Sequence, residues 1–160
     1  MTCVILEDVS LRDGLQFEQK VLPLEEKLIL FHLLVNAGLK RLQVGSFVHP
    51  ELIPQTADTD EFVRIIKNEC SDILVTALVL NGKGLERARD CHLSHLTMSV
   101  SASDSHSRRN VKRPSLEALM DMIELVKNAV DSGILVRVGI QCAFGCVYEG
   151  AISEDKILEI

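Results

Sequence analysis

Tryptophan is absent from the 160 residues, and one tyrosine and five phenylalanines leave aromatic side chains at 4%. No run of 18 apolar residues occurs, so a membrane-spanning helix is not expected. Acidic residues outnumber Lys and Arg by 23 to 17, and the net charge of −6 argues against nucleic acid as the main partner. The five cysteines, odd in number and irregularly spaced, do not suit a disulfide framework and indicate reduced thiols in the cytoplasm. A small molecule is the expected partner.

Hydrophobic residues make up 47% of the chain and are chiefly Leu, Ile and Val, as expected for strands that are buried on both faces. Short apolar runs alternate with longer segments of helical period. The expected strands cover residues 3–6, 41–45, 73–80, 96–100 and 135–140, and the expected helices begin near Pro23, Asp58, Gly82, Ser115 and Ser153. Such repeating β–α units predict an α/β fold with a parallel sheet and no internal domain boundary.

Two arrangements of the parallel sheet, open or closed into a barrel, are consistent with these β–α units. An open sheet of five strands would be complete at this length, whereas a (β/α)₈ barrel needs eight strands and about 250 residues. The loops that follow the strands favour the barrel, because barrels carry their chemistry there and these loops are polar. They are Ser10–Gln16, Ser46–Pro50, Ser101–Asn110 and Cys142–Gly150. The first of them has no Gly-x-Gly-x-x-Gly, which argues against a dinucleotide site.

Four segments, in order along nearly the whole chain, resemble the metal-dependent barrel lyases and Claisen-condensing enzymes, and among them the 3-hydroxy-3-methylglutaryl-CoA lyases. The segments are Arg12-Asp13-Gly14-Leu15-Gln16, Ser46-Phe47-Val48 with Pro50 and Pro54-Gln55, Ser103 to Asn110, and Cys142-Ala143-x-Gly145-Cys146-x-Tyr148-Glu149-Gly150. Arg-Asp-Gly alone is a weak signal, but the four together are specific.

The resemblance implies a TIM barrel of which this chain supplies about five β–α units. Residues 1–160 would be the N-terminal part of a single catalytic domain, truncated after strand five. The family completes its metal site with a His-x-His pair from a later strand. That pair is missing here, since His32, His49, His92, His95 and His106 are never two residues apart.

The resemblance also assigns roles around the first loop. Asp13 is the metal-ligand position, and a carboxylate suits Mg²⁺ or Mn²⁺. Arg12 would stabilise enolate charge beside the reacting carbonyl, because a guanidinium stays charged. Gln16 could point into the same pocket, and Gln43 stands where the lyases carry Glu near the end of strand two. An amide can hydrogen-bond to Arg but cannot take a proton, which leaves the substrate open.

The later loops are expected to meet the acyl-CoA. Ser103 would flank the acyl chain, and Arg108, Arg109 and Asn110 follow it closely enough to reach CoA phosphates. Cys142 and Cys146 lack Cys-x-x-Cys spacing and are interpreted as buried wall residues.

Three functions are consistent with these features. The first is a lyase that cleaves a 3-hydroxy-3-methylglutaryl-CoA-like ester to acetyl-CoA and acetoacetate, inactive as the isolated 160 residues. The second is a condensing enzyme that joins an acyl-CoA to a 2-oxo acid. Gly14-Leu15-Gln16 favours the lyase over this alternative. The third is a non-catalytic half-barrel that pairs with a second chain, since unpaired strand edges promote association. A homodimer is the expected oligomeric state.

Overall fold

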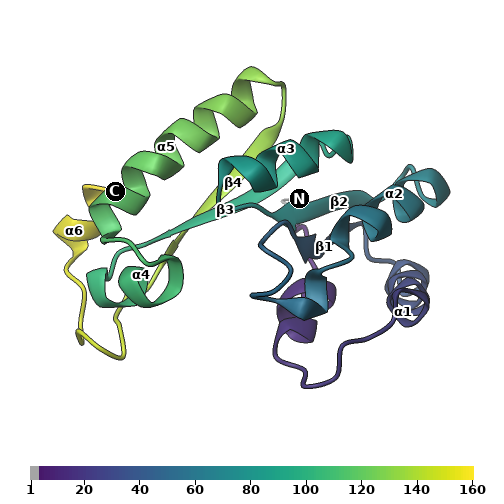
Figure 1. Ribbon diagram of the computed structural model, residues 1–160, viewed down its shortest axis with the longest axis horizontal. Coiled ribbons are helices and arrows are strands. Elements are labelled where there is room, and N and C mark those ends of the chain that lie inside the picture. Colours follow the sequence, from purple (N-terminus) through teal and green to yellow (C-terminus); the bar gives the residue numbers. More distant parts are fainter. Residues whose placement is uncertain (1–3) are drawn as a thin grey trace. The chain divides into compact units, whose positions relative to one another are not determined.

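The computed structural model describes residues 4–160, in which four strands alternate with helices (Figure 1). The strands are β1 (Arg41–Ser46), β2 (Leu74–Leu78), β3 (His95–Ser101) and β4 (Leu135–Gln141). The helices are α1 (Leu24–Asn36), α2 (Thr59–Glu69), α3 (Gly82–Asp90), α4 (Asp104–Val111), α5 (Ser115–Asp131) and α6 (Glu154–Leu158), with a π-helical turn η1 (Ser10–Gly14) and a 3₁₀ turn η2 (Pro54–Thr56). The strands form one parallel sheet in the order β1-β2-β3-β4, which confirms the α/β fold.

The chain divides into two compact units, Met1–Leu96 and Thr97–Ile160. In the first unit the core lies between the sheet and α1 and α2. The Phe31 ring of α1 and the Phe62 ring of α2 meet edge to face with centroids 6.2 Å apart, and both side chains are buried. Leu42 on β1 and Val75 on β2 are paired in register and also buried.

Strand β1 presents its two faces to different surroundings. Gln43 is paired in register with Thr76 of β2, on the face opposite to Leu42 and Val75, because side chains alternate along a strand. The register shifts between Gln43 and Gly45, so that Gly45 turns toward α2. A Cβ on Gly45 would lie 2.4 Å from Thr59 Oγ1. Glycine is therefore the residue that lets α2 pack closely on the end of β1.

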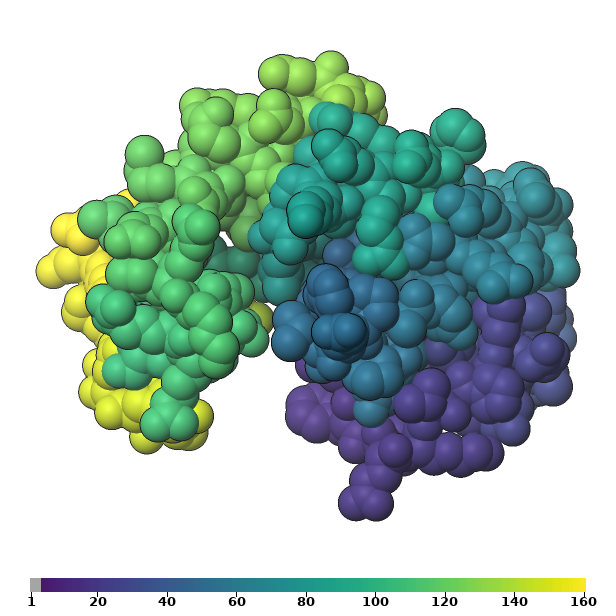
Figure 2. Space-filling model, in the orientation of Figure 1, coloured from purple at the N-terminus to yellow at the C-terminus, as the bar shows by residue number. Residues whose placement is uncertain are grey.

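The second unit buries less of its apolar surface. Helix α5 packs through Met122, Leu125 and Ala129, while Leu116 and Met120 are exposed. This helix, drawn in green, lies at the surface of its unit (Figure 2). Strand β4 is also largely open, with Leu135 and Val138 exposed. Among the described residues, every helix is too short or too polar to cross a lipid bilayer.

The structure corrects two expectations. The strand expected over residues 3–6 is not formed at Val4, Ile5 and Leu6, and Cys3 lies outside the described residues. These three side chains are 69–81% exposed, so the rest of residues 4–160 covers little of this apolar run. A single parallel bridge joins Asp8 to Leu42 instead, and residues 4–160 therefore contain four strands where five were expected.

The second correction concerns two of the polar loops. Ser10–Gly14 forms η1, and Asp104–Val111 forms helix α4 within the segment expected to be a loop. Ser103 caps α4, since its hydroxyl accepts a hydrogen bond from the His106 amide at 3.1 Å. A serine hydroxyl that accepts a hydrogen bond from the backbone amide three residues later is a helix N-cap. The polar composition of the segment did not distinguish this N-cap from a loop.

Candidate functional site

The turn η1 is positioned at β1 by backbone hydrogen bonds on both sides of Asp8. The Asp8 amide donates to the Arg41 carbonyl at 3.0 Å, and the Gln43 amide donates to the Asp8 carbonyl at 2.8 Å. The Asp8 carboxylate then accepts from the Ser10 amide at 3.0 Å and from its hydroxyl at 2.5 Å. These bonds hold the segment at Asp8 beside β1, just before the chain enters η1.

Three of the predicted residues meet at this turn. Arg12 Nε donates to Gln43 Oε1 at 2.5 Å, and Arg12 Nη1 pairs with Asp13 Oδ1 at 2.5 Å. The side chain of Arg12 is 18% exposed and that of Asp13 is 47% exposed. Gln16 lies half-buried just beyond η1, and its side chain forms no hydrogen bond within residues 4–160. The structure therefore joins Arg12, Asp13 and Gln43 and leaves Gln16 beside them.

The face of the sheet that carries Gln43 is polar. Glu7, which is 8% exposed, accepts from Thr76 Oγ1 at 2.7 Å and pairs with Arg41 Nε at 3.3 Å. Gln43 itself is 1% exposed, and its Nε2 has no hydrogen-bond partner within residues 4–160. Barrel interiors are usually filled by branched apolar side chains, so this polar layer is a departure that the sequence analysis did not anticipate.

The residues of this site meet only part of what a divalent cation needs. Mg²⁺ takes oxygen ligands in near-octahedral geometry, and Asp13 offers one carboxylate whose Oδ1 already pairs with Arg12. Nowhere in residues 4–160 do three His, Cys, Asp or Glu side chains gather as a metal-binding group. The described residues thus fit a contribution of one ligand and do not hold a cation by themselves.

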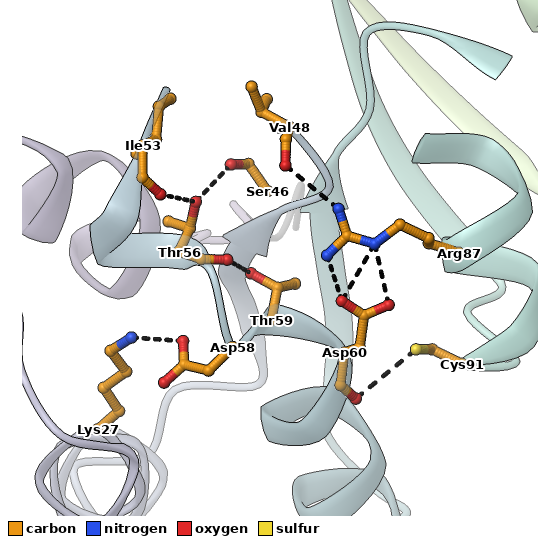
Figure 3. A network of polar contacts seen from close by, with 10 residues as sticks. All are labelled: Lys27, Ser46, Val48, Ile53, Thr56, Asp58, Thr59, Asp60, Arg87 and Cys91. Carbon is orange, nitrogen blue, oxygen red and sulfur yellow. Dashed lines mark hydrogen bonds and ion pairs between the residues drawn. The ribbon is translucent and has the colours of Figure 1, made fainter. Parts of the chain in front are cut away.

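The loop that follows β1 is braced from three helices (Figure 3). Ser46 Oγ lies 2.9 Å from Thr56 Oγ1, and Thr59 Oγ1 donates to the Thr56 carbonyl at 2.7 Å. Lys27 of α1 is 3% exposed, and its Nζ pairs with Asp58 Oδ1 at 2.5 Å and donates to the Gln55 carbonyl at 2.6 Å. A buried lysine is stable only with such partners.

Arg87 of α3 is the centre of the same brace. Its Nε donates to the Asp60 carboxylate at 3.1 and 3.2 Å, its Nη2 also pairs with Asp60, and its Nη1 donates to the Val48 carbonyl at 3.2 Å. The guanidinium lies 5.3 Å from the centroid of the Phe47 ring. The sequence analysis missed Arg87, because an arginine among the other charges of a short helix resembles a solvated residue.

In the second unit, Ser103 connects α4 to the loop after β4. Its hydroxyl donates to Cys146 Sγ at 2.9 Å, and this bond is the main reason that the pKa of Cys146 is lowered. Burial raises the pKa of the Cys142 thiol. The Glu149 carboxylate accepts from the Ser105 amide at 2.5 Å, and this bond lowers the pKa of Glu149. Glu149 thus ties the loop after β4 to the start of α4.

The basic residues expected to meet CoA lie exposed on α4. Arg108 Nε donates to Asp104 Oδ2 at 2.6 Å, and the Arg109 guanidinium lies 4.2 Å from the centroid of the Tyr148 ring. Asn110 follows them and is exposed. Arg109 is thereby held against the loop that contains Cys146, whereas Arg108 is paired along its own helix.

We expect Ser103→Ala to raise the pKa of Cys146, because the hydroxyl that stabilises the thiolate is removed. The rate of iodoacetamide alkylation of Cys146 increases with pH as the thiolate forms. In the variant this increase should occur at a higher pH than in the original protein, as followed by peptide mass spectrometry from pH 6 to 10. Cys91 is the internal control, since its raised pKa comes chiefly from burial. An unchanged Cys146 profile would contradict the assignment.

The alternating strands and helices and the single parallel sheet place the chain among the parallel α/β proteins. The chain belongs to the HMGL-like family, whose sequence model matches residues 3–160.

Named relatives agree with this membership. The chain is 34% identical over 169 positions to an (R)-citramalyl-CoA lyase of Chloroflexus aurantiacus, covering 100% of this chain and 53% of the relative. It is 29% identical to the hydroxymethylglutaryl-CoA lyase YngG of Bacillus subtilis, covering 98% of this chain and 52% of that protein. The chain thus spans about half the length of the curated relatives it matches.

Solved structures show the same correspondence. The crystal structure of the Bacillus subtilis HMG-CoA lyase matches with a TM-score of 0.91 at 29% identity, over 98% of this chain and 52% of that one. An HMG-CoA lyase from Acinetobacter baumannii in complex with coenzyme A and 3-methylmalate matches with a TM-score of 0.89 at 31% identity, over 99% and 53%.

Proposed function

We propose that this chain is the N-terminal part of a single TIM-barrel domain that acts as a carbon–carbon lyase on an acyl-CoA. The substrate would be a 3-hydroxy-3-methylglutaryl-CoA-like ester, cleaved to acetyl-CoA and acetoacetate. The observation that carries the proposal is the cluster in which Arg12 bonds both Gln43 and Asp13. The lyase relatives support it, since they match nearly the whole of this chain over about half of their own length.

The reaction explains why an arginine is needed. A base removes the hydroxyl proton, the hydroxyl-bearing carbon becomes a ketone, and the electron pair of the broken C–C bond moves onto the acetyl thioester as an enolate, which is then protonated at carbon. Arg12 would stabilise the enolate oxygen, since a preorganised charged donor is most effective where charge develops. Neither a guanidinium nor an amide accepts the proton at neutral pH, so the base is neither Arg12 nor Gln43.

Asp13 would contribute one carboxylate to a divalent cation, Mg²⁺ or Mn²⁺. Such a cation polarises the substrate oxygens that it binds. The remaining ligands would have to be supplied from outside this cluster, because nowhere in residues 4–160 do three His, Cys, Asp or Glu side chains gather. Gln16, half-buried next to η1, would line the same pocket.

Helix α4 would meet the coenzyme A. Arg108 and Arg109 are exposed and charged, which suits phosphate oxygens, and Asn110 adds an amide beside them. Ser103 is buried at the start of the helix and would act by holding α4 against the Cys146 loop. We infer a cytoplasmic enzyme, although named relatives include both cytoplasmic and mitochondrial lyases.

The test is a cleavage assay on the complete protein with 3-hydroxy-3-methylglutaryl-CoA and with citramalyl-CoA, with and without Mg²⁺. We expect metal-dependent release of acetyl-CoA. The same assay on the 160 residues alone should show little or no activity, because one carboxylate does not retain the ion. Condensation of acetyl-CoA with a 2-oxo acid, without cleavage of either ester, would support the condensing alternative.

The exposed strand β4 favours a second candidate, a half-barrel that associates with another copy. Leu135 is 63% exposed and Val138 is 44% exposed, and strand edges and apolar surface of this kind promote pairing. Size-exclusion chromatography with light scattering should then give a dimer for the 160-residue chain. A monodisperse monomer with a cooperative thermal transition would argue against it.

A further inference from the structure

Two cysteines face each other in the loop that follows β4. Cys142 and Cys146 are free thiols, and their side chains are hydrogen-bonded to one another. Cys142 is half-buried, and Cys146 is 7% exposed. Three residues separate the two cysteines in the sequence, and this spacing does not by itself bring them together. The pair takes no part in the reaction proposed above.

The backbone of the loop brings the two thiols into contact. Cys142 adopts a left-handed conformation with φ of 57°, which is uncommon for residues other than glycine. The Gly145 amide donates to the Cys142 carbonyl at 3.2 Å and closes a turn directly before Cys146. Cys146 is held by two backbone hydrogen bonds to Gly150, at 2.7 and 2.8 Å. The loop therefore holds the thiols together while both are reduced, and such proximity is what a disulfide requires.

The two thiols are chemically unequal. The Ser103 hydroxyl donates to Cys146 Sγ at 2.9 Å and the Tyr148 amide donates to it at 3.4 Å, and both bonds lower the pKa of Cys146. Burial raises the pKa of Cys142. The thiolate is the nucleophilic form of cysteine, so Cys146 should react first with an oxidant. Cys142 is then the adjacent thiol that can complete the reaction.

We propose that Cys142 and Cys146 form a reversible disulfide when the protein is exposed to hydrogen peroxide. In the first step the Cys146 thiolate attacks a peroxide oxygen, the O–O bond breaks, and Cys146 becomes a sulfenic acid. The hydroxide that leaves takes up the proton that Cys146 released. In the second step the Cys142 sulfur attacks the Cys146 sulfur, the S–O bond breaks, and the second hydroxide takes the Cys142 proton. The two thiols lose two electrons, and the peroxide is reduced to two molecules of water.

A packing role would be simpler, because cysteine often serves as a small buried apolar side chain. Cys91 provides the reference for such a role. It is buried, its Sγ donates to the Asp60 carbonyl at 3.6 Å, and burial raises its pKa. If Cys142 and Cys146 only filled space, they should be oxidised no faster than Cys91. A disulfide-forming pair should be oxidised well before it.

The experiment treats the complete protein with hydrogen peroxide at pH 7, then unfolds it and labels the remaining thiols with N-ethylmaleimide. Trypsin releases both cysteines in one peptide, Val138–Lys156, because no Lys or Arg lies between its ends. We expect this peptide to lose both labels and to become two hydrogens lighter, and dithiothreitol to restore the labelled form. The peptide with Cys91 should keep its label. If Val138–Lys156 keeps both labels, or gains oxygen without losing hydrogen, at peroxide concentrations that oxidise Cys91, the inference is wrong.

Three variants test the geometry. Cys142→Ser removes the second thiol, so Cys146 should stop at the sulfenic acid, which dimedone traps, and no disulfide should form. Ser103→Ala should slow disulfide formation at pH 7, because less of Cys146 is ionised without this hydroxyl. Ser132→Ala is its matched control, since it removes an exposed hydroxyl that bonds to the Asn128 carbonyl, and it should leave the rate unchanged. Equal rates in Ser103→Ala and Ser132→Ala would contradict the assignment of Cys146 as the thiol that reacts first.

Discussion

Arg12→Met should lower the kcat of the complete protein by about 100- to 1,000-fold, the range found when one donor to a developing oxyanion is removed. KM should change little, because the enolate charge that Arg12 stabilises is absent from the bound ester. Methionine keeps much of the apolar stem and removes the guanidinium that holds Gln43 and Asp13. Steady-state kinetics with 3-hydroxy-3-methylglutaryl-CoA would measure both constants.

Arg64→Met is the matched control for this experiment, since Arg64 lies exposed on α2. It removes the same charge and should leave kcat within a factor of two of the original value. If Arg12→Met raised KM and left kcat intact, Arg12 would bind the ground state, and its role at the enolate would be wrong.

Arg87→Met should lower the free energy of unfolding by about 2–4 kcal/mol, slightly less than the loss of one partner of a fully buried ion pair. The side chains of Arg87 and Asp60 are 28% and 25% exposed, so the carboxylate left behind is partly hydrated. The variant also loses the bond to the Val48 carbonyl and the contact with Phe47. Urea denaturation followed by circular dichroism would give the value.

Two further variants distinguish the loss of the Arg87–Asp60 ion pair from a nonspecific loss of stability. Arg113→Met breaks a pair with Asp121 whose side chains are 55% and 61% exposed, and it should cost less than about 1 kcal/mol. Arg87→Met combined with Asp60→Leu should recover part of the loss, because replacing both charges by apolar groups leaves no unpaired carboxylate. No difference between Arg87→Met and Arg113→Met would show that the brace in Figure 3 contributes little.

The sequence was sufficient for the elements whose pattern is local. The strands β1, β2, β3 and β4 and the helices α1, α2 and α5 lie close to the expected ranges, since Pro, Gly and apolar period marked their ends. The strand expected at residues 3–6 was wrong for residues 4–6, because an apolar run becomes a strand only where a neighbour covers it. The local sequence pattern does not indicate whether another element packs over the apolar run.

In the candidate site, too, the contacts between residues close in sequence were easier to predict than those between distant residues. Arg12 and Asp13 are adjacent in a motif, so their proximity needed no tertiary structure. The contact of Arg12 with Gln43 spans 31 positions and depends on the bridge between Asp8 and β1, so it was indicated by the family resemblance and by no short motif. The brace around Arg87 stayed hidden for the same reason, since its partners Asp60 and Val48 lie on separate elements.

The π-helical turn η1 makes the first loop intolerant of changes in length. The amides of Arg12, Asp13 and Gly14 all donate to the Val9 carbonyl, at 3.1, 2.7 and 3.3 Å, so the turn carries one residue more than an α-helical turn would. Deleting a single residue between Val9 and Arg12 would tighten the turn and rotate the guanidinium by about 100°, away from β1. Natural variation in this segment should therefore exchange side chains while leaving the number of residues constant.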